Sequence, residues 1–253
     1  MDNKAIVLDK VSKSFVEQLG HKTLKHLFIS IGDKILKRKI KTERNTKQAL
    51  ADISLEVEKG DFFGIVGRNG SGKSTLLKII AGVYVPTSGS VLRNGTLTPF
   101  IELGVGFNPE LSGKDNVFLN AALLGFTRKQ TQKMYTSIVH FAELEDFMDL
   151  KLKHYSSGMQ VRLAFSVAVK SESDILLLDE VLAVGDINFQ EKCFKYFEKL
   201  KKEKKTVIFV SHDLEAIKKF CNKAVLINNS KLVAQGNPRW IAEKYLKIMQ
   251  ESN

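Results

Sequence analysis

Short runs of apolar, often β-branched residues recur along the chain, and helix-like stretches follow most of them. The runs lie at residues 57, 62–66, 175–178, 207–210 and 224–227. This alternation predicts a largely parallel sheet covered by helices on both faces, because buried parallel strands form nearly continuous apolar runs. Between about residues 109 and 171 the strand pattern stops and helix-forming sequence replaces it. We therefore expect an α/β core interrupted by a helical subdomain.

Chain length and composition limit the class of protein. The 253 residues are 43% hydrophobic and 26% charged, which suits one globular domain or two small ones. No apolar run approaches the roughly 18 residues of a membrane-spanning helix. The N-terminus carries acids and no continuous apolar segment, so it does not suit a secretory signal. The two cysteines, Cys193 and Cys221, are too few for a disulfide framework and lack metal-ligand spacing. We expect a reduced, cytosolic protein.

Basic residues are concentrated near the N-terminus. The chain has 39 Lys and Arg against 28 Asp and Glu, a formal net charge of +11. Residues 21–50 alone hold nine cations and two acids, which is +7 of that total. A nucleic-acid surface, a contact with anionic lipid headgroups and a merely solvated face are three open explanations.

The motif GRNGSGKST, residues 67–75, lies between strand-like and helix-like sequence and fits the pattern G-x-x-x-x-G-K-[ST]. Its glycines let backbone N–H groups face phosphate oxygens, at a helix N-terminus whose dipole favours anions. We expect Lys73 to reach the β- and γ-phosphates and the Ser74 hydroxyl to ligate Mg²⁺. The expected nucleotide-binding residues of this loop are Gly67, Asn69, Gly70, Ser71, Gly72, Lys73, Ser74 and Thr75.

A later strand-like run, ILLLDE at residues 175–180, ends in two carboxylates. Adjacent carboxylates at the end of a buried strand need a cation nearby. We interpret them as phosphoryl-transfer residues: Asp179 would hold Mg²⁺ through water, and Glu180 would polarise the water that attacks the γ-phosphate. A strand that ends in Asp-Glu is commonplace by itself, so this interpretation depends on the preceding P-loop.

Two further segments have both a structural and a functional interpretation. In YSSGMQ, residues 155–160, Ser156 and Gly158 either begin an ordinary helix or present a helix N-terminus to a nucleotide held by a second subunit. In VSHD, residues 210–213, His212 ends a strand. A histidine there is usually structural, but beside a nucleotide site it is suited to contact a γ-phosphate.

In their order along the chain, GRNGSGKST, YSSGMQ, ILLLDE and VSHD resemble the P-loop, signature, second carboxylate motif and switch histidine of ABC-type ATPases. The resemblance covers nearly the whole chain. It implies a P-loop NTPase fold with an α-helical and an antiparallel β subdomain, ATP and Mg²⁺ as cofactors, and a head-to-tail homodimer around two ATP molecules. It also implies that Phe15 stacks on adenine and that Asp186 lies in the loop crossing the dimer interface. Ser156 and Gly158 would contact the γ-phosphate of the opposite subunit, and His212 that of its own.

Departures from the commonest ABC pattern narrow the resemblance. The signature reads YSSGM instead of LSGGQ, and the segments DEVLAVGD and ELGVGFNPELSGKDN resemble ATP-binding subunits that export lipid-linked polysaccharides such as O-antigen or wall teichoic acid. That branch also has a long insertion before the P-loop strand. The resemblance implies an ATPase that drives export through two copies of a polytopic transmembrane permease. The chain itself would lie peripherally on the cytoplasmic face of the inner (plasma) membrane.

One ABC element is missing from the sequence. The glutamine that couples Mg²⁺ and the attacking water to the membrane subunit should fall between the P-loop and the signature. No Gln occurs from Leu97 to Lys129. Glu102 and Asn108 are the candidates to replace it, and we leave the role unassigned.

The basic insertion, residues 16–48, has a helical apolar pattern. Leu24, Leu27, Phe28, Ile31 and Ile35 recur at helical spacing with cations around them. One interpretation is a surface helix packed on its own domain. The other is an amphipathic helix at the cytosolic membrane surface, where it contacts anionic lipid headgroups or guides a lipid-linked glycan.

We expect a single ABC ATPase domain over residues 1–253, with the helical subdomain at about 109–171, a C-terminal tail at 226–253 and no appended carbohydrate-binding domain. An ATPase of another transporter type, such as an importer, is one competing hypothesis. A nucleic-acid-associated ABC protein is another, suggested by the positive charge. It predicts tandem ATPase units or a long coiled-coil insertion, which this chain lacks, so we expect no nucleic-acid partner.

Overall fold

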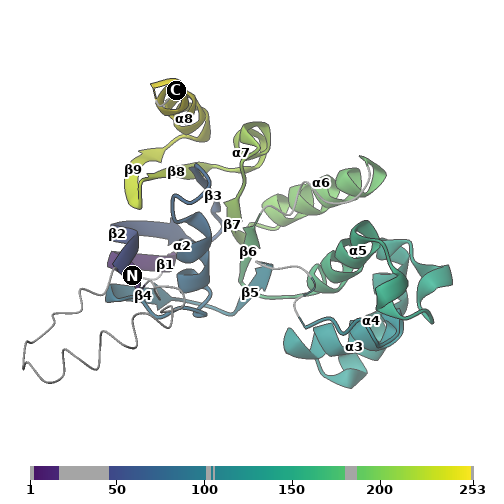
Figure 1. The fold of residues 1–253 in the computed structure, drawn as a ribbon. Helices are drawn as coiled ribbons and strands as arrows, with labels where there is room; N and C mark the ends of the chain where they lie inside the picture. The colour runs from purple at the N-terminus through teal and green to yellow at the C-terminus, as the bar shows by residue number, and fades with distance from the viewer. Residues whose placement is uncertain (1–2, 17–45, 101–103, 105, 180–186, 252–253) are drawn as a thin grey trace, which may run out of the picture.

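The strands in the described part of the chain form two sheets (Figure 1). A computed structural model describes residues 3–16, 46–100, 104, 106–179 and 187–251. The smaller sheet is antiparallel with the order β2-β1-β4, built from β1 (Lys4–Val16), β2 (Thr46–Glu58) and β4 (Ser88–Arg93). This sheet confirms the antiparallel subdomain that the ABC resemblance implies.

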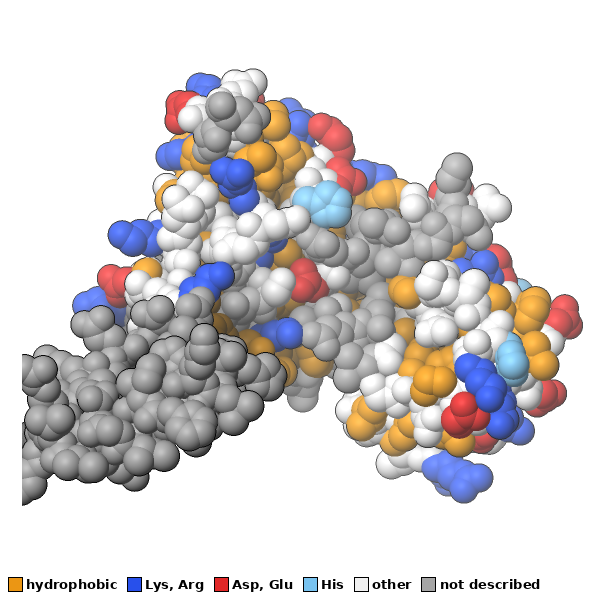
Figure 2. All heavy atoms as spheres, viewed as in Figure 1, with side chains coloured by type: hydrophobic (Ala, Val, Ile, Leu, Met, Phe, Trp, Pro, Cys, Tyr) orange, Lys and Arg blue, Asp and Glu red, His pale blue; other side chains and the backbone are white. Residues whose placement is uncertain are grey.

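The basic insertion is shorter than the range 16–48 that we expected. Val16 pairs with Thr46 and Phe15 with Lys47, so both ends of that range belong to the antiparallel sheet. The predicted helical stripe and all the cations between these strands lie outside the described residues. On the visible face of the described part, basic and acidic side chains are interspersed (Figure 2).

The larger sheet has six strands in the order β5-β6-β7-β3-β8-β9. The strands are β3 (Phe62–Gly67), β5 (Leu97–Phe100), β6 (Ile175–Asp179), β7 (Thr206–Val210), β8 (Lys223–Asn228) and β9 (Lys231–Gly236). All neighbours are parallel except β8 and β9, so the predicted largely parallel sheet is confirmed. The segment 226–253, which we expected as a tail, contributes the end of β8, β9 and α8 (Pro238–Glu251) to this core.

Alternate residues of the central strands face two different apolar clusters, as the two-residue period of a strand requires. Phe62 and Val66 of β3 face a cluster that includes residues of α6 (Ile187–Lys202), α7 (Leu214–Phe220) and α8. Phe63 and Ile65 face a cluster shared with α2 (Lys73–Ile80) and the antiparallel sheet. Helices thus lie on both faces, as predicted, but α2 shares the second face with β1 and β2.

The helical subdomain lies beside the edge strand β5 and contains α3 (Gly113–Leu123), α4 (Arg128–Ala142) and α5 (Ser157–Ala168) (Figure 1). Short 3-10 helices at Glu145–Phe147 and Leu152–His154 connect α4 to α5. These helices bury their own apolar cluster, which includes Val117, Ile138 and Leu163. Thr127 and Gln130 form a capping box that sets where α4 begins. Within the described residues, none of the helices combines the length and apolar character needed to cross a membrane.

Candidate functional site

The P-loop connects β3 to α2 at the carboxyl end of the parallel sheet. Gly70 and Gly72 have φ angles of 77° and 110°, a left-handed backbone that favours glycine. The space beside Gly72 is also closed, since a Cβ there would lie 2.5 Å from the carbonyl oxygen of Ala49. The loop borders a cavity of about 630 Å³. Eight predicted site residues line it: Phe15, Asn69, Gly70, Gly72, Lys73, Ser74, Thr75 and Asp179.

Lys73 gives the cavity a buried positive charge. Its side chain is at the first position of α2, and the residue is only 6% exposed. The ammonium donates hydrogen bonds to the carbonyl oxygens of Gly67 at 2.7 Å and Arg68 at 3.0 Å. The N-terminus of α2 adds the positive end of a helix dipole. Because a buried cation is stabilised by a nearby anion, this end of the cavity suits a polyphosphate.

An aromatic group lines the part of the cavity that β1 contributes. The rings of Phe15 and Tyr84 meet edge to face with centroids 5.5 Å apart. The Lys13 ammonium lies 5.2 Å from the Phe15 ring centroid and 5.7 Å from that of Tyr84. Since Phe15 also lines the cavity, its ring is available to stack on a nucleobase. Tyr84, which sequence reasoning missed, orients that ring.

Two oxygen-bearing side chains face the same cavity, as a magnesium site requires. Ser74 follows Lys73 in α2, and Asp179 ends β6. Among the described residues no group of three or more His, Cys, Asp or Glu is placed to hold a metal. The two oxygens of Ser74 and Asp179 fit Mg²⁺, which usually binds through one or two protein oxygens together with substrate phosphates and waters.

Four residues that the sequence did not indicate complete the lining: Lys47, Gln48, Ala49 and Ser230. The first three belong to β2 and the last to the turn between β8 and β9. No motif distinguishes these positions. Only the fold brings residues 47–49 and 230 beside the P-loop.

His212 lies on the other side of the P-loop. It lines a smaller cavity of about 460 Å³ with Gly67, Arg68, Asn69 and two residues of α8. Asn69 borders both cavities, so the crest of the P-loop separates them. Gly67 thus faces this smaller space, and a Cβ on it would lie 2.3 Å from the carbonyl oxygen of Ile227.

Ser71 is the predicted P-loop residue that lines neither cavity. It is 5% exposed, and its buried hydroxyl has no hydrogen-bond partner in the described part of the chain. Its carbonyl oxygen accepts a hydrogen bond from the backbone N–H of Ser230 at 3.2 Å. Ser71 therefore connects the P-loop to the β8–β9 turn.

The signature segment begins α5, away from the P-loop cavity. Ser156 caps the helix by accepting a hydrogen bond from the Met159 N–H at 3.2 Å. A Cβ on Gly158 would meet only the Ser156 hydroxyl oxygen, at 3.9 Å, so packing within the described chain does not demand glycine there. Tyr155 anchors the segment by donating its hydroxyl to the Phe147 carbonyl at 2.7 Å, and burial raises its pKa to about 12.

Several predicted residues lie outside the described part of the chain: Glu102, Glu180, Asp186 and residues 17–45. Asn108, the other candidate for the missing glutamine, is described. Its side-chain oxygen accepts the Glu110 N–H at 3.0 Å, and its own N–H donates to Asn116 at 2.7 Å. These bonds hold the turn that leads into α3. Asn108 does not line the P-loop cavity.

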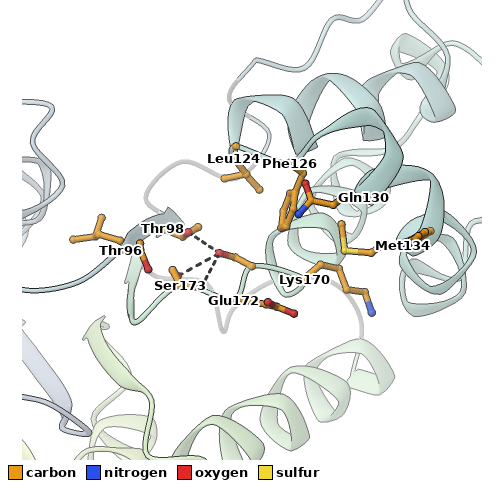
Figure 3. Close-up of a pocket in the computed structure, with 13 residues that line it drawn as sticks. Thr96, Thr98, Leu124, Phe126, Gln130, Met134, Lys170, Glu172 and Ser173 are labelled. Carbon is orange, nitrogen blue, oxygen red and sulfur yellow. Dashed lines mark hydrogen bonds between the residues drawn. The ribbon is translucent and has the colours of Figure 1, made fainter.

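A third cavity, of about 470 Å³, lies between the helical subdomain and the amino ends of β5 and β6 (Figure 3). The Thr98 and Ser171 hydroxyl groups are hydrogen-bonded at 2.7 Å, and Ser171 donates to Ser173 at 3.2 Å. Burial, and to a smaller extent Lys199, lowers the pKa of Lys170 at its edge. The P-loop cavity lies at the opposite, carboxyl end of the sheet, so this third cavity is distinct from it.

Comparison with known proteins agrees with this geometry. Residues 50–183 match the family model described as ABC transporter. The O-antigen export system ATP-binding protein RfbB of Klebsiella pneumoniae is 47% identical over 201 residues, which are 79% of this chain and 82% of the relative. The teichoic acids export ATP-binding protein TagH of Staphylococcus haemolyticus is 38% identical over 83% of this chain and 80% of its own length.

A solved structure shares the fold at low sequence identity. The dimeric post-hydrolysis state of the ATP-binding cassette MJ0796, bound to ADP and Pi, has a TM-score of 0.71 and 23% identity, covering 92% of this chain and 99% of that one. The expected ABC fold is confirmed. From its sequence relatives, its fold and its P-loop cavity, this chain belongs to the ABC transporter family, as an ATP-binding cassette ATPase.

Proposed function

We propose that this chain is the ATP-hydrolysing subunit of an exporter for a lipid-linked polysaccharide of the O-antigen or teichoic acid type. The observation that carries the proposal is the 47% identity to an O-antigen export ATP-binding protein, over a segment that includes the P-loop cavity. The 38% identity to a teichoic acid export protein supports the same class of cargo. The transport path would belong to two copies of a separate polytopic permease, with this chain peripheral on the cytoplasmic face of the membrane.

The site residues expected from the sequence divide the work of ATP binding and phosphoryl transfer among them. Phe15 stacks on the base, while Lys73 and the N–H groups of residues 69–75 bind the phosphates. Ser74 and Asp179 would hold Mg²⁺, which when bound would supply positive charge to the transferred phosphoryl group. Glu180 polarises the attacking water, and His212 contacts the γ-phosphate from the other side of the P-loop.

A second copy of the chain completes the site. Ser156 and Gly158 lie in the helical subdomain and do not line the P-loop cavity of their own chain. The space beside Gly158 is open, which permits close approach of another molecule. In a head-to-tail homodimer, the N-terminus of α5 faces the γ-phosphate held by the opposite P-loop. Closing and reopening of this dimer would drive the permease.

Purification of the chain with its transmembrane partner tests the function directly. The ATPase activity of the complex in lipid nanodiscs should rise when a lipid-linked O-antigen or teichoic acid precursor is added, and Glu180→Gln should abolish it. A free glycan without its lipid serves as the matched control and should have no effect. Stimulation by RNA, or salt-sensitive RNA binding, with no response to any lipid-linked glycan would contradict the proposal.

The basic segment 17–45 extends the proposal to the membrane surface. It joins β1 and β2 next to Phe15, and each of its cations near anionic lipid would contribute about 1 kcal/mol. Changing Lys37, Arg38, Lys39 and Lys41 to Gln should reduce transport more than ATPase activity in detergent. The control removes the same charge from exposed Lys195, Lys199, Lys202 and Lys204 of the α6 region. Equal effects of both sets on transport, or equal loss of transport and ATPase activity, would argue against a membrane or glycan contact.

A further inference from the structure

The P-loop cavity, the proposed nucleotide cavity, is built from two separate sheets. The P-loop and Asp179 extend from the six-stranded sheet, whereas Phe15 and residues 47–49 belong to the antiparallel sheet. Phe15 pairs with Lys47, and Ser14 with Gln48, so the position of β2 sets the position of the base-stacking ring. A nucleotide that contacts both ends of the cavity therefore requires the two sheets to be held in a defined relation.

Ser230 joins these parts. Its backbone N–H donates to the Ser71 carbonyl of the P-loop at 3.2 Å, and its own carbonyl accepts the Ala51 N–H of β2 at 2.8 Å. Its hydroxyl donates to the Gln48 carbonyl at 3.0 Å. Ser230 also lines the nucleotide cavity. One residue thus bonds the phosphate-binding loop and the strand beside the base.

The backbone of this turn is strained in a way that glycine would relieve. Ser230 has a φ of 65° and its neighbour Asn229 a φ of 47°, both in the left-handed region. Residues with a Cβ adopt that region at a cost in free energy that glycine avoids. Serine at this position keeps the hydroxyl that bonds Gln48, which glycine would lose.

We propose that Ser230 is a positioning residue for nucleotide binding, which sets Phe15 and β2 at the correct distance from the P-loop. The proposal rests on the nucleotide site described above. It acts through Gln48 and Ser71, and it concerns the relation between the two ends of the site. A ligand that touches only the phosphate end should therefore not depend on the Ser230 hydroxyl.

The test compares two ligands by isothermal titration calorimetry: ATP, which spans both ends of the cavity, and inorganic tripolyphosphate, which occupies the phosphate end. Ser230→Ala should raise the Kd for ATP about three- to ten-fold, as expected for loss of one hydrogen bond. It should change the Kd for tripolyphosphate less than two-fold. In ATPase assays the KM for ATP should rise with kcat nearly unchanged.

Two further variants make the test decisive. Ser230→Gly removes the hydroxyl and relieves the backbone, so it should show the same loss of ATP affinity in a chain at least as stable to heat. Asn229→Gly relieves the neighbouring residue, which is exposed, and should leave both Kd values within two-fold of the wild type. Unchanged ATP binding in both Ser230 variants, or equal weakening of ATP and tripolyphosphate, would overturn the role of Ser230. A wild-type chain that binds neither ligand would instead overturn the nucleotide site itself.

Discussion

Single residues of the P-loop meet different physical demands although the motif makes them look alike. Gly70 and Gly72 both have positive φ angles. A Cβ on Gly70 would meet nothing within 4 Å, whereas one on Gly72 would lie 2.5 Å from the Ala49 carbonyl oxygen and 2.8 Å from the Leu50 side chain. Gly70 is therefore needed for its backbone conformation alone, and Gly72 for conformation and for contact with β2.

This difference predicts unequal effects of two alanine substitutions. Gly72→Ala must push β2 away from the P-loop, so it should lower the free energy of unfolding by about 2–4 kcal/mol and weaken ATP binding more than ten-fold. Gly70→Ala should cost only about 1 kcal/mol, the strain of a left-handed alanine. Urea denaturation and ATP titration of the two variants measure both quantities. Equal losses of stability would show that close packing on Ala49 is unimportant.

At the scale of elements, α5 combines a structural and a functional end. Ser156 caps the helix, and Tyr155 holds the preceding turn through its bond to the Phe147 carbonyl. The same hydroxyl of Ser156 is proposed to contact the nucleotide of a second copy. Capping and nucleotide contact can be separated experimentally, because a capping bond affects stability whether or not the chain dimerises.

Ser156→Ala should lower the free energy of unfolding by about 1 kcal/mol, the usual value of an N-cap bond. Binding of ATP to the isolated monomer should stay unchanged, while kcat should fall about ten-fold or more, because the lost contact belongs to the transition state in the dimer. Thermal melting, ATP titration and turnover measurements give the three values. Ser157→Ala, at the next exposed position, is the control and should change none of them. An unaltered kcat in Ser156→Ala would leave this serine with a capping role only.

At the scale of the whole molecule, the proposed catalytic residues are divided between the core and the helical subdomain. The P-loop cavity belongs to the core built from both sheets, and the signature helix belongs to the helical subdomain with its own apolar cluster. In the proposed dimer, each chain therefore supplies the P-loop side of one catalytic site and the signature side of the other. Dimerisation and hydrolysis should be coupled for this reason.

Glu180→Gln should separate the two events. The variant keeps the residues that bind phosphates but lacks the carboxylate that polarises water, so ATP should convert it to a stable dimer with turnover reduced at least a thousand-fold. Size-exclusion chromatography with light scattering, with and without ATP, measures the dimer. Adding Lys73→Ala to the variant should abolish the ATP-dependent dimer. Normal hydrolysis by Glu180→Gln would contradict the role assigned to this glutamate.

Sequence reasoning located the parts of the site that are contiguous in the chain. The P-loop and Asp179, which line the cavity, were predicted because each belongs to a short, specific run of residues at the end of a strand. It placed the ends of the insertion less well, because Val16 and Thr46 become strand residues only by pairing with each other. It also missed that β1 and β2 share one face of the larger sheet with α2. An apolar strand face could equally well have packed against a helix, so the sequence pattern did not distinguish the two arrangements.

The sequence by itself determined the class of fold, the family and the phosphate-binding chemistry, because local spacing of glycine, lysine and carboxylate residues is enough to specify them. Only the tertiary structure decided which other groups share the cavity. Lys47, Gln48 and Ser230 carry no motif and line the cavity beside the P-loop through pairing and packing of strands distant in sequence. Tyr84 likewise carries no motif and packs on Phe15. Contacts of that kind depend on how the two sheets sit together, which local spacing does not encode.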